Sequence, residues 1–322
     1  MRVAFDTSPL VQTRAGTARH VRGLLGALRD RADVELELVS FGGSGRASSL
    51  VRDALWYPLG LRRRARGAEV LHCPTFRGPR NARMPVVLTV HDLAILRAPG
   101  VFPAWHRLYG RAGLRGVLRH ADAIVAVSEF TRRELETLVG VPEERIRVVP
   151  NGVDAVFTTD GPAVEGDYVL AVATLEPRKN LGRVVEAAEL AGVELRVVGA
   201  RGWGGVEVPG WVGELTDAEL AMLYRGARCV LYPSLYEGFG LPVLEAMASG
   251  TPVVTSVGTV MEEVAGGAAV LVDPLEPSAI AAGIREAEDR RAELTPLGIE
   301  RAAAFTWDRA ADGVSELWKE LA

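Results

Sequence analysis

Short apolar runs rich in β-branched residues alternate with longer amphipathic stretches over the first 150 residues. The runs predict strands at Arg2–Phe5, Val34–Val39, Glu69–His72, Val86–Val90, Ala123–Val127 and Ile146–Val149. Most of these runs are almost continuously apolar, as strands are when both faces of a parallel sheet are covered. Helical patterns lie between them, for example at Thr17–Leu28 and Phe130–Val139. The pattern therefore predicts a doubly wound α/β domain.

A turn-rich connector, Pro150–Asp167, separates this half from a second series of the same kind. Its predicted strands are Tyr168–Ala173, Glu194–Val198, Val208–Val212, Cys229–Tyr232, Pro252–Thr255 and Ala269–Val272. Its predicted helices are Leu181–Leu190, Asp217–Tyr224, Pro242–Ala248, Val260–Val264 and Pro277–Arg290, followed by Asp308–Leu321. We therefore expect an α/β protein with two Rossmann-like domains, 1–155 and 165–305, facing across a cleft. We expect 306–322 to form a helix that packs back toward the first domain.

The composition, 48% hydrophobic and 24% charged, is typical of a globular protein of 322 residues. No apolar run approaches the ~18–20 residues that a membrane span needs. Because Met1-Arg2 leads directly into a strand-like run, we expect no signal peptide. Cys73 and Cys229 are typical of small core residues rather than of a disulfide or metal site, which favours a reducing cytoplasm.

The net charge of -4 hides an asymmetry between the two halves. Residues 1–150 hold 24 arginines against 14 acidic residues, a charge of +10, whereas 151–322 hold 13 basic against 27 acidic residues, a charge of -14. The basic half could face a phosphate group, a polyanion or an acidic membrane, or it could simply carry arginines on solvated faces. Nucleic acid is a poorer partner, because no matching motif accompanies the charge.

Two stretches of the first half mix aromatic residues with arginine, Leu55–Gly67 and Phe102–His120. They could hold the chain at an anionic membrane surface, at the inner face of the membrane. Amphipathic helices packed on the sheet would give the same pattern, and we weigh this second reading somewhat higher.

The densest chemical signal is "LYPSLYEGFGLPVLEAMASGTPVV", Leu231–Val254. A strand ends near Pro233, and a loop carries Glu237-Gly238-Phe239-Gly240. A helix follows with Pro242 at its first position, and Gly250 suits the residue beyond its end. The glycines let the backbone approach a ligand, and a helix N-terminus binds phosphate. Glu237 and Glu245 can line one pocket and accept hydrogen bonds from sugar hydroxyls. A glycine-rich turn with a glutamate that offsets the helix dipole is the structural alternative.

"LEPRKN" follows the first strand of the second half and opens the next helix, at the edge where open α/β sheets bind ligands. Lys179 is one of only two lysines among 37 basic residues, and Arg178 stands beside it. Two cations at a helix N-terminus are slightly unfavourable, so we infer a function for them. A lysine offers a compact charge that can reach a phosphate oxygen in a crowded site, and the pair could neutralise a diphosphate.

In the first half, five candidate residues, four of them polar, follow strands at the corresponding edge of the first predicted sheet. They are Gly16 and Thr17 after the first strand, His91 and Asp92 after the fourth, and Ser128 after the fifth, where a helix cap is its simpler role. A structural His91, bonded to Asp92 or to backbone, is the alternative to a functional one. No metal-spaced Cys/His cluster and no Asp-x-Asp sequence occurs, so we expect no metal and no cofactor.

Taken together, "LEPRKN" and the Glu237-x7-Glu245 stretch resemble the retaining GT-B glycosyltransferases of family 4, among them bacterial mannosyl- and rhamnosyl-transferases of surface polysaccharides. "HDL", "AVSEFTRREL", "RIRVVPNGVD" and "FTWDRAA" extend the resemblance over nearly the whole chain. It implies a nucleotide-diphosphate sugar donor, GDP- or UDP-linked, in the second domain, and a glycan or lipid-linked acceptor in the first.

The resemblance also implies roles for individual residues. Lys179, Arg178, Glu237 and His91 would act in catalysis, while donor contacts would come from Gly238, Phe239, Gly240, Leu241, Glu245 and Thr174, together with Glu237 and the two cations. Gly16, Thr17, His91, Asp92 and Ser128 would lie on the acceptor side. Many family members have arginine where this chain has Thr174, and Arg178 would replace it. A non-catalytic nucleotide-sugar-binding protein and a GT-B epimerase or phosphorylase are the alternatives.

Overall fold

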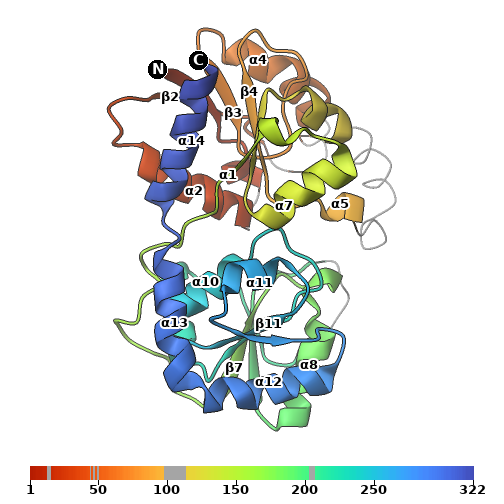
Figure 1. Ribbon diagram of the computed structural model, residues 1–322, viewed down its shortest axis with the longest axis vertical. Helices are drawn as coiled ribbons and strands as arrows, with labels where there is room; N and C mark the ends of the chain where they lie inside the picture. The colour runs from red at the N-terminus through yellow and green to blue at the C-terminus, as the bar shows by residue number, and fades with distance from the viewer. Residues whose placement is uncertain (13–15, 44, 46–47, 49–50, 98–113, 203–206) are drawn as a thin grey trace. The chain divides into compact units, whose positions relative to one another are not determined.

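The computed structural model describes residues 1–322 except 13–15, 44, 46–47, 49–50, 98–113 and 203–206. The chain divides into two compact units (Figure 1). The first unit comprises Met1–Gly152 and Thr306–Ala322, and the second comprises Val153–Phe305. Each unit is built round its own parallel six-stranded sheet, so the predicted pair of Rossmann-like α/β domains is confirmed.

The sheet of the first unit has the strand order β2-β1-β3-β4-β5-β6, and every described pairing is parallel. Its strands are β1 (Arg2–Asp6), β2 (Glu35–Val39), β3 (Val70–Cys73), β4 (Val86–Val90), β5 (Ala123–Ala126) and β6 (Ile146–Val148). All residues of β3, β4 and β5 are buried. Their largely apolar sequences are therefore explained by helices on both faces of the sheet.

The first unit carries short helices and two π-helical segments around its sheet. They are α1 (Pro9–Gln12), α2 (Gly16–Leu28), the π-helix η1 (Arg52–Gly60), α4 (Leu61–Arg64), α5 (Ala94–Arg97), α7 (Glu129–Glu134), the π-helix η3 (Leu135–Val139), the 3-10 helix η4 (Glu143–Arg145) and α14 (Trp307–Leu321). Residues 114–120 are also helical. Leu61, Leu118 and Leu135 pack on one face of the sheet, and α2 and α14 cover the other.

The helix α14 comes from the far end of the chain and completes the core of the first unit, beside α2 (Figure 1). Trp318 is fully buried, and its Nε1–H donates a hydrogen bond of 3.1 Å to Nδ1 of His72 in β3. A Cβ on Gly23 of α2 would lie 2.0 Å from the ring of Trp307. A glycine is therefore required where α14 begins to pack on α2.

The sheet of the second unit has the strand order β12-β11-β10-β7-β8-β9. Its strands are β7 (Tyr168–Val172), β8 (Glu194–Val198), β9 (Trp211–Gly213), β10 (Val230–Tyr232), β11 (Val253–Ser256) and β12 (Val270–Val272). The order of connection reverses between β7 and β10, which are neighbours. The carboxyl ends of these two strands form the switch point at which open α/β sheets bind ligands.

The helices of the second unit lie on both faces of its sheet. They are the 3-10 helix η5 (Pro177–Lys179), α8 (Leu181–Ala191), α9 (Asp217–Gly226), α10 (Leu241–Ala248), α11 (Val260–Ala265), α12 (Pro277–Asp289) and α13 (Arg291–Ala303). The helix α12 packs beside α8, and α10 packs against α13 (Figure 1). Within the described residues, no helix is both long and apolar enough to span a bilayer.

Two predicted elements of the second unit were wrong in their bounds or missing. The strand expected at Val208–Val212 is β9, Trp211–Gly213, because Gly210 turns the chain with a φ of 76° directly before it. The helix α13 was not predicted, since Pro296 within it suggests a break. Tertiary packing decides otherwise: Gly298 of α13 lies against Met247 of α10, where an added Cβ would be 3.1 Å from the Met247 Cγ.

Candidate functional site at the switch point of the second sheet

Two loops bring the predicted charged residues together at the carboxyl ends of β7 and β10. Arg178 and Lys179 lie on η5, shortly after β7, and Glu237 lies in the loop after β10. The backbone N–H of Leu235 donates to the carbonyl of Arg178 at 2.9 Å, which joins the two loops directly. The sequence pattern placed these residues on separate stretches, and the fold makes them one cluster.

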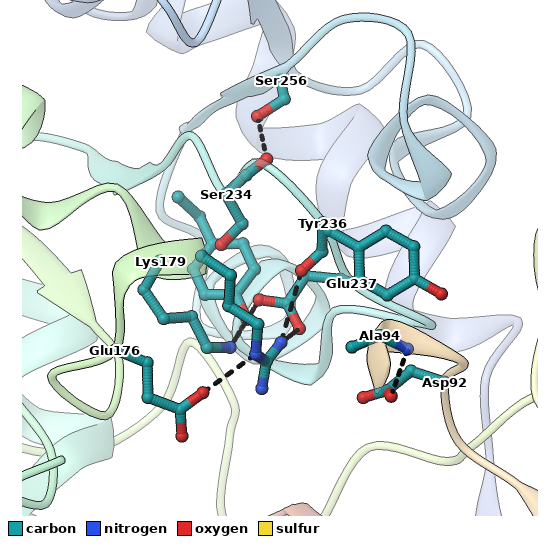
Figure 2. Close-up of polar contacts among 10 residues, drawn as sticks. Asp92, Ala94, Glu176, Lys179, Ser234, Tyr236, Glu237 and Ser256 are labelled. Atoms are coloured by element: carbon teal, nitrogen blue, oxygen red, sulfur yellow. Dashed lines mark hydrogen bonds and ion pairs between the residues drawn. The ribbon is translucent and has the colours of Figure 1, made fainter. Parts of the chain in front are cut away.

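Glu237 is held by both cations at once. Its Oε2 lies 2.6 Å from Nη1 of Arg178, and its Oε1 lies 2.5 Å from Nζ of Lys179. Figure 2 shows the side chain of Lys179 directed at the carboxylate of Glu237. Arg178 also donates from Nε to Oε2 of Glu176 at 2.9 Å. The cluster is largely shielded, since the side chains of Glu237, Lys179 and Arg178 are only 9%, 11% and 18% exposed.

Tyr232, the last residue of β10, adds a hydroxyl group to the cluster. Its hydroxyl accepts a hydrogen bond from Nζ of Lys179 at 2.9 Å and donates one to Oε1 of Glu237 at 3.1 Å. The Nζ also lies 5.1 Å from the centroid of the Tyr232 ring, a cation–π contact. Tyr232 is 4% exposed, so its hydroxyl depends on these partners. The sequence analysis did not single out this residue.

The charges of the cluster reinforce one another. Burial opposes ionisation of Glu237, but Lys179 and Arg178 outweigh it and lower the pKa of this carboxyl to about 2. Burial likewise disfavours charge on Lys179, yet Glu237 raises the pKa of its ammonium above the usual value. Burial, followed by the charge of Glu237, raises the pKa of Tyr232 to about 12. At neutral pH the two cations therefore face an ionised Glu237 and a neutral phenol, and Glu176 is a second carboxylate bonded to Arg178.

Asn180 fixes the turn that presents the two cations. Its φ of 60° makes it the one non-glycine residue with positive φ in the described part of the chain. Its Nδ2 donates to the carbonyls of Pro233 at 3.0 Å and Pro274 at 2.6 Å, and Asn180 is 4% exposed. Left-handed backbone costs free energy in a non-glycine residue, and it recurs at functional sites. The signal was available, because asparagine tolerates this conformation better than most residues.

The glycine-rich loop leads into α10 as predicted. Gly240 caps the helix with a φ of 123°, and a Cβ there would lie 2.8 Å from Cε of Met261. Leu241 is the first helical residue and Pro242 the second, while Gly250 follows the end of α10 with a φ of 75°. The ring of Phe239 packs edge-on against that of Phe305, with 5.9 Å between the ring centroids.

Glu245 is buried on α10 and bonded to Tyr224. It occupies the second turn of α10, is 1% exposed, and accepts a hydrogen bond from the hydroxyl of Tyr224 at 3.0 Å. Thr174 is partly exposed just after β7, and its carbonyl accepts the N–H of Glu176 at 2.7 Å. Gly238 is buried in the loop. The donor contacts expected of these three residues stay predictions.

The first unit gathers three of its five predicted residues around one cavity. Thr17, His91 and Asp92 line a space of about 370 Å³. Gly16 is exposed at the start of α2. Ser128 does not line the cavity; it is fully buried and caps α7 by accepting the N–H of Thr131 at 3.0 Å.

The imidazole of His91 has a defined state. Its Nε2 lies 3.0 Å from the carbonyl oxygen of Pro74, which can only accept, so Nε2 carries the proton. Burial lowers the pKa of His91, and the ring of His20 stands edge-on to it at 4.7 Å. Asp92 accepts the N–H of Ala94 through Oδ1 at 3.0 Å (Figure 2), not a bond from His91. Histidine 91 is therefore bonded to backbone and neutral at pH 7.

The charged cluster and the cavity can be compared with the ligand sets that metal ions need, within the part of the chain that the structure describes. Among the described residues, no group of three or more His, Cys, Asp or Glu side chains is placed to hold a metal ion. The two cysteines, Cys73 and Cys229, are free and buried, as their sequence context predicted. A second hollow of about 490 Å³, between α8 and the β8–β9 edge, contains none of the predicted site residues.

Two Rossmann-like units with a cation pair and a glycine-rich loop at the switch point of the second define a GT-B glycosyltransferase. Models of two families match the chain, Glycosyltransferase Family 4 over residues 14–157 and Glycosyl transferases group 1 over residues 159–298. O-antigen chain mannosyltransferase B of Escherichia coli is 32% identical over 349 residues, which cover 98% of this chain and 88% of that relative. The chain belongs to the group 1 glycosyltransferases of the family 4 type. It is an enzyme, as predicted, a nucleotide-sugar-dependent transferase.

Solved structures agree on the fold. Sucrose-phosphate synthase from Thermosynechococcus elongatus has a TM-score of 0.79 to this chain at 20% identity, covering 100% of this chain and 99% of the other. The HepE protein of Anabaena, in complex with UDP-glucose, has a TM-score of 0.76 at 17% identity, covering 100% of both chains. The GT-B fold class is thereby confirmed.

Proposed function

We propose that this enzyme transfers a hexose, mannose or a related sugar, from a GDP- or UDP-sugar to a glycan or lipid-linked acceptor. The observation that carries the proposal is the pair Arg178 and Lys179, locked on Glu237 at the switch point of the second sheet. The name of the E. coli mannosyltransferase supports mannose as the sugar. The UDP-glucose complex of HepE supports a nucleotide sugar as the donor.

The cluster suits a donor diphosphate because carboxylates hold its two cations in fixed positions. Both Arg178 and Lys179 are positioned by the carboxylate of Glu237, and Arg178 is also held by that of Glu176. A diphosphate at the switch point would gain ammonium and guanidinium donors and the N–H groups at the start of α10. Glu237 then accepts hydrogen bonds from the hydroxyls of the donor sugar. Glu245, in the same helix, accepts those of the ribose.

The chemistry follows from charge rather than from a protein nucleophile. The bond between the anomeric carbon and the diphosphate breaks, and negative charge grows on the leaving oxygen. Arg178 and Lys179 stabilise that charge in a shielded site, where fixed cations act most strongly. The acceptor hydroxyl attacks from the same face and gives its proton to the leaving diphosphate, so the anomeric configuration is retained. The reaction needs neither a metal nor a cofactor.

The first unit holds the acceptor in the cavity lined by Thr17, His91 and Asp92. A neutral His91 that donates to Pro74 offers Nδ1 as an acceptor for a sugar hydroxyl. We place the enzyme in the cytoplasm, with peripheral contact to an anionic membrane through the first unit. Leu55 is 55% exposed on η1, and the arginines of α4 lie close by in sequence, which supports such contact.

The test is a thermal-shift titration of the chain with GDP, UDP, ADP and dTDP and with their common sugar conjugates, with and without magnesium. At 100 times the dissociation constant, a ligand adds about 2.7 kcal/mol to the free energy of unfolding. That corresponds to a rise of several degrees in the melting temperature. We expect one base to give this rise equally with and without magnesium. No shift with any of the nucleotides would overturn the proposal.

Donor hydrolysis then separates an enzyme reaction from simple binding. We expect slow release of the nucleoside diphosphate from the stabilising donor, even without an acceptor, and we expect the released hexose to keep its anomeric configuration at first. Inverted configuration, measured by proton NMR immediately after release, would contradict the same-face mechanism while leaving the donor site intact.

A further inference from the structure

Arg52 is a buried arginine that the sequence analysis did not assign. It is the first residue of η1, it is 6% exposed, and it lines the 370 Å³ cavity of the first unit together with Arg77. A guanidinium almost withdrawn from water is costly unless its charge and its five N–H donors find partners. The question is which partners the cavity provides.

Among the described residues, Arg52 is ion-paired with one carboxylate, that of Asp53, which it shares with Arg77. Nε of Arg52 lies 3.0 Å from Oδ1 of Asp53, whose side chain is 50% exposed. Nε of Arg77 lies 3.9 Å from the same oxygen. Among the described residues, Nη1 and Nη2 of Arg52 make no hydrogen bond or ion pair. Two guanidinium groups therefore share a single half-exposed anion.

A buried carboxyl, that of Asp6, interacts with Arg52 through its charge, but its described hydrogen bonds go to Ser8. Asp6, at the end of β1, is fully buried, and its Oδ1 accepts both the N–H of Ser8 at 3.0 Å and the hydroxyl of Ser8 at 2.5 Å. Burial raises the pKa of Asp6, although Ser8 and the charge of Arg52 act in the opposite direction.

We propose that the cavity holds a phosphate group of the acceptor, bound by the terminal nitrogens of Arg52 with Arg77 as a second cation. A guanidinium presents its N–H groups as a planar fork that matches two phosphate oxygens. The remaining lining suits a sugar, since Thr17, Thr75 and Asp92 offer hydroxyl and carboxylate groups. The volume is within the range of small-molecule sites. The ligand class is a phosphorylated sugar, either a glycosyl phosphate or the head of a lipid-linked diphosphate.

This inference rests on the proposed function only in calling the ligand an acceptor. It excludes a wholly neutral glycan as the best ligand of the cavity, because such a glycan would leave Asp53 as the one carboxylate ion-paired with Arg52 and Arg77 among the described residues. It also gives the positive charge of the first half a specific site, rather than a diffuse surface.

The experiment measures phosphate binding to the full chain by phosphorus NMR and calorimetry. The probes are inorganic phosphate, glucose 6-phosphate and a short isoprenyl diphosphate, with methyl glucoside as the neutral counterpart. The variants are Arg52→Gln, Arg77→Gln and Arg178→Gln. Arg63→Gln is the matched control, because Arg63 is an exposed arginine of α4 in the same unit with no ion pair among the described residues.

We expect the wild type, R63Q and R178Q to bind glucose 6-phosphate or the isoprenyl diphosphate in the first unit. We expect R52Q to bind the same probe roughly 10- to 100-fold more weakly, as a lost charge-assisted hydrogen-bond pair predicts. The more exposed R77Q should lose up to about fivefold. Whichever probe binds more tightly identifies the source of the phosphate, sugar or lipid.

Binding that R52Q and R77Q both leave unchanged would overturn the proposal, as would binding that only R178Q removes, since the phosphate would then occupy the donor site. Equal binding of methyl glucoside would overturn it as well. If R52Q does not fold, R77Q against R63Q decides the matter, because both positions are more exposed. Failure of every nucleotide in the thermal-shift titration would refute the donor site and leave this result standing.

Discussion

Replacement of Lys179 by methionine tests the proposed donor site most directly. Methionine keeps an unbranched side chain of similar length and removes only the ammonium. The change breaks the contact of 2.5 Å to Glu237 and the hydrogen bond of 2.9 Å to Tyr232. Arg178 still lies 2.6 Å from the other oxygen of Glu237, so the carboxylate keeps one cation.

The expected magnitudes follow from that geometry. Removing one partner of a buried ion pair costs about 3–5 kcal/mol of folding free energy. Because Arg178 and Tyr232 continue to satisfy Glu237, we expect the lower end, about 3 kcal/mol. If Lys179 also stabilises the leaving diphosphate, kcat should fall about 100- to 1,000-fold, the usual cost of losing one donor to a developing anion.

The assay measures release of the nucleoside diphosphate at saturating donor, in parallel with urea unfolding. The matched control is Lys319→Met, since Lys319 is the chain's other lysine and pairs at 2.6 Å with Asp33 on the surface. We expect K319M to leave kcat unchanged. Lys179→Arg separates charge from shape: it should restore most of the stability but keep kcat at least about tenfold low, because a planar fork does not replace a compact ammonium.

Wild-type turnover in K179M would refute the role assigned to Lys179, whatever the stability change. An equal loss of kcat in K179M and K319M would show that the effect comes from net charge and not from the site. Restored turnover in K179R would show that the cluster needs only a positive charge, and it would remove the reason inferred for keeping a lysine among arginines.

Three further predictions concern the same loops. Tyr232→Phe should lower kcat up to about tenfold with little change in KM, and it should cost about 1 kcal/mol of unfolding free energy, because it removes one hydroxyl between two groups that remain paired. Steady-state kinetics and urea unfolding test this, and a change in KM alone would contradict it. Asn180→Ala should destabilise the protein by about 1 kcal/mol more than Asn180→Gly, because both lose the bonds to Pro233 and Pro274 but only alanine must hold a φ of 60°; equal unfolding free energies would refute this reason. The pKa of Glu237 is lowered to about 2 in the folded protein, so its contribution to stability is complete above the unfolded value of 4.5 and is lost as pH falls toward 2. Glu237→Gln should therefore flatten the fall of the unfolding free energy between those two pH values. Parallel plots of unfolding free energy against pH for wild type and E237Q would argue against a folded pKa that low.

The architecture could be predicted from the sequence because each strand and helix has a local pattern of apolar and polar residues. The strand Val86–Val90 is almost continuously apolar and buried along its whole length, as strands are in a sheet covered on both faces. The strand β9 was misplaced because Trp211–Gly213 is three residues long, and a three-residue edge strand has too little pattern to locate. The helix α13 was missed because its packing against α10 outweighs the local signal of Pro296.

The candidate site was predictable in its members but not in its bonding. Lys179 stood out as a rare residue type, and Glu237 stood out in a glycine-rich loop. Nothing local shows that both cations meet one carboxylate, since Lys179 and Glu237 are 58 positions apart. Tyr232 and Arg52 were missed for the same reason: each matters through what folding places beside it.

The helix α14 also bears on the order in which the chain can fold. Trp318, which fills the core of the first unit beside Phe5 and His72, is synthesised only after the whole of Val153–Phe305. Until α14 is synthesised, the apolar residues of the first 152 residues that pack on it stay uncovered. The second unit is a continuous segment and can fold as soon as it has been made. A nascent chain is therefore most exposed to chaperones and proteases in its earliest part, and a frameshift near residue 306 would spare the second unit while leaving the first without its last helix.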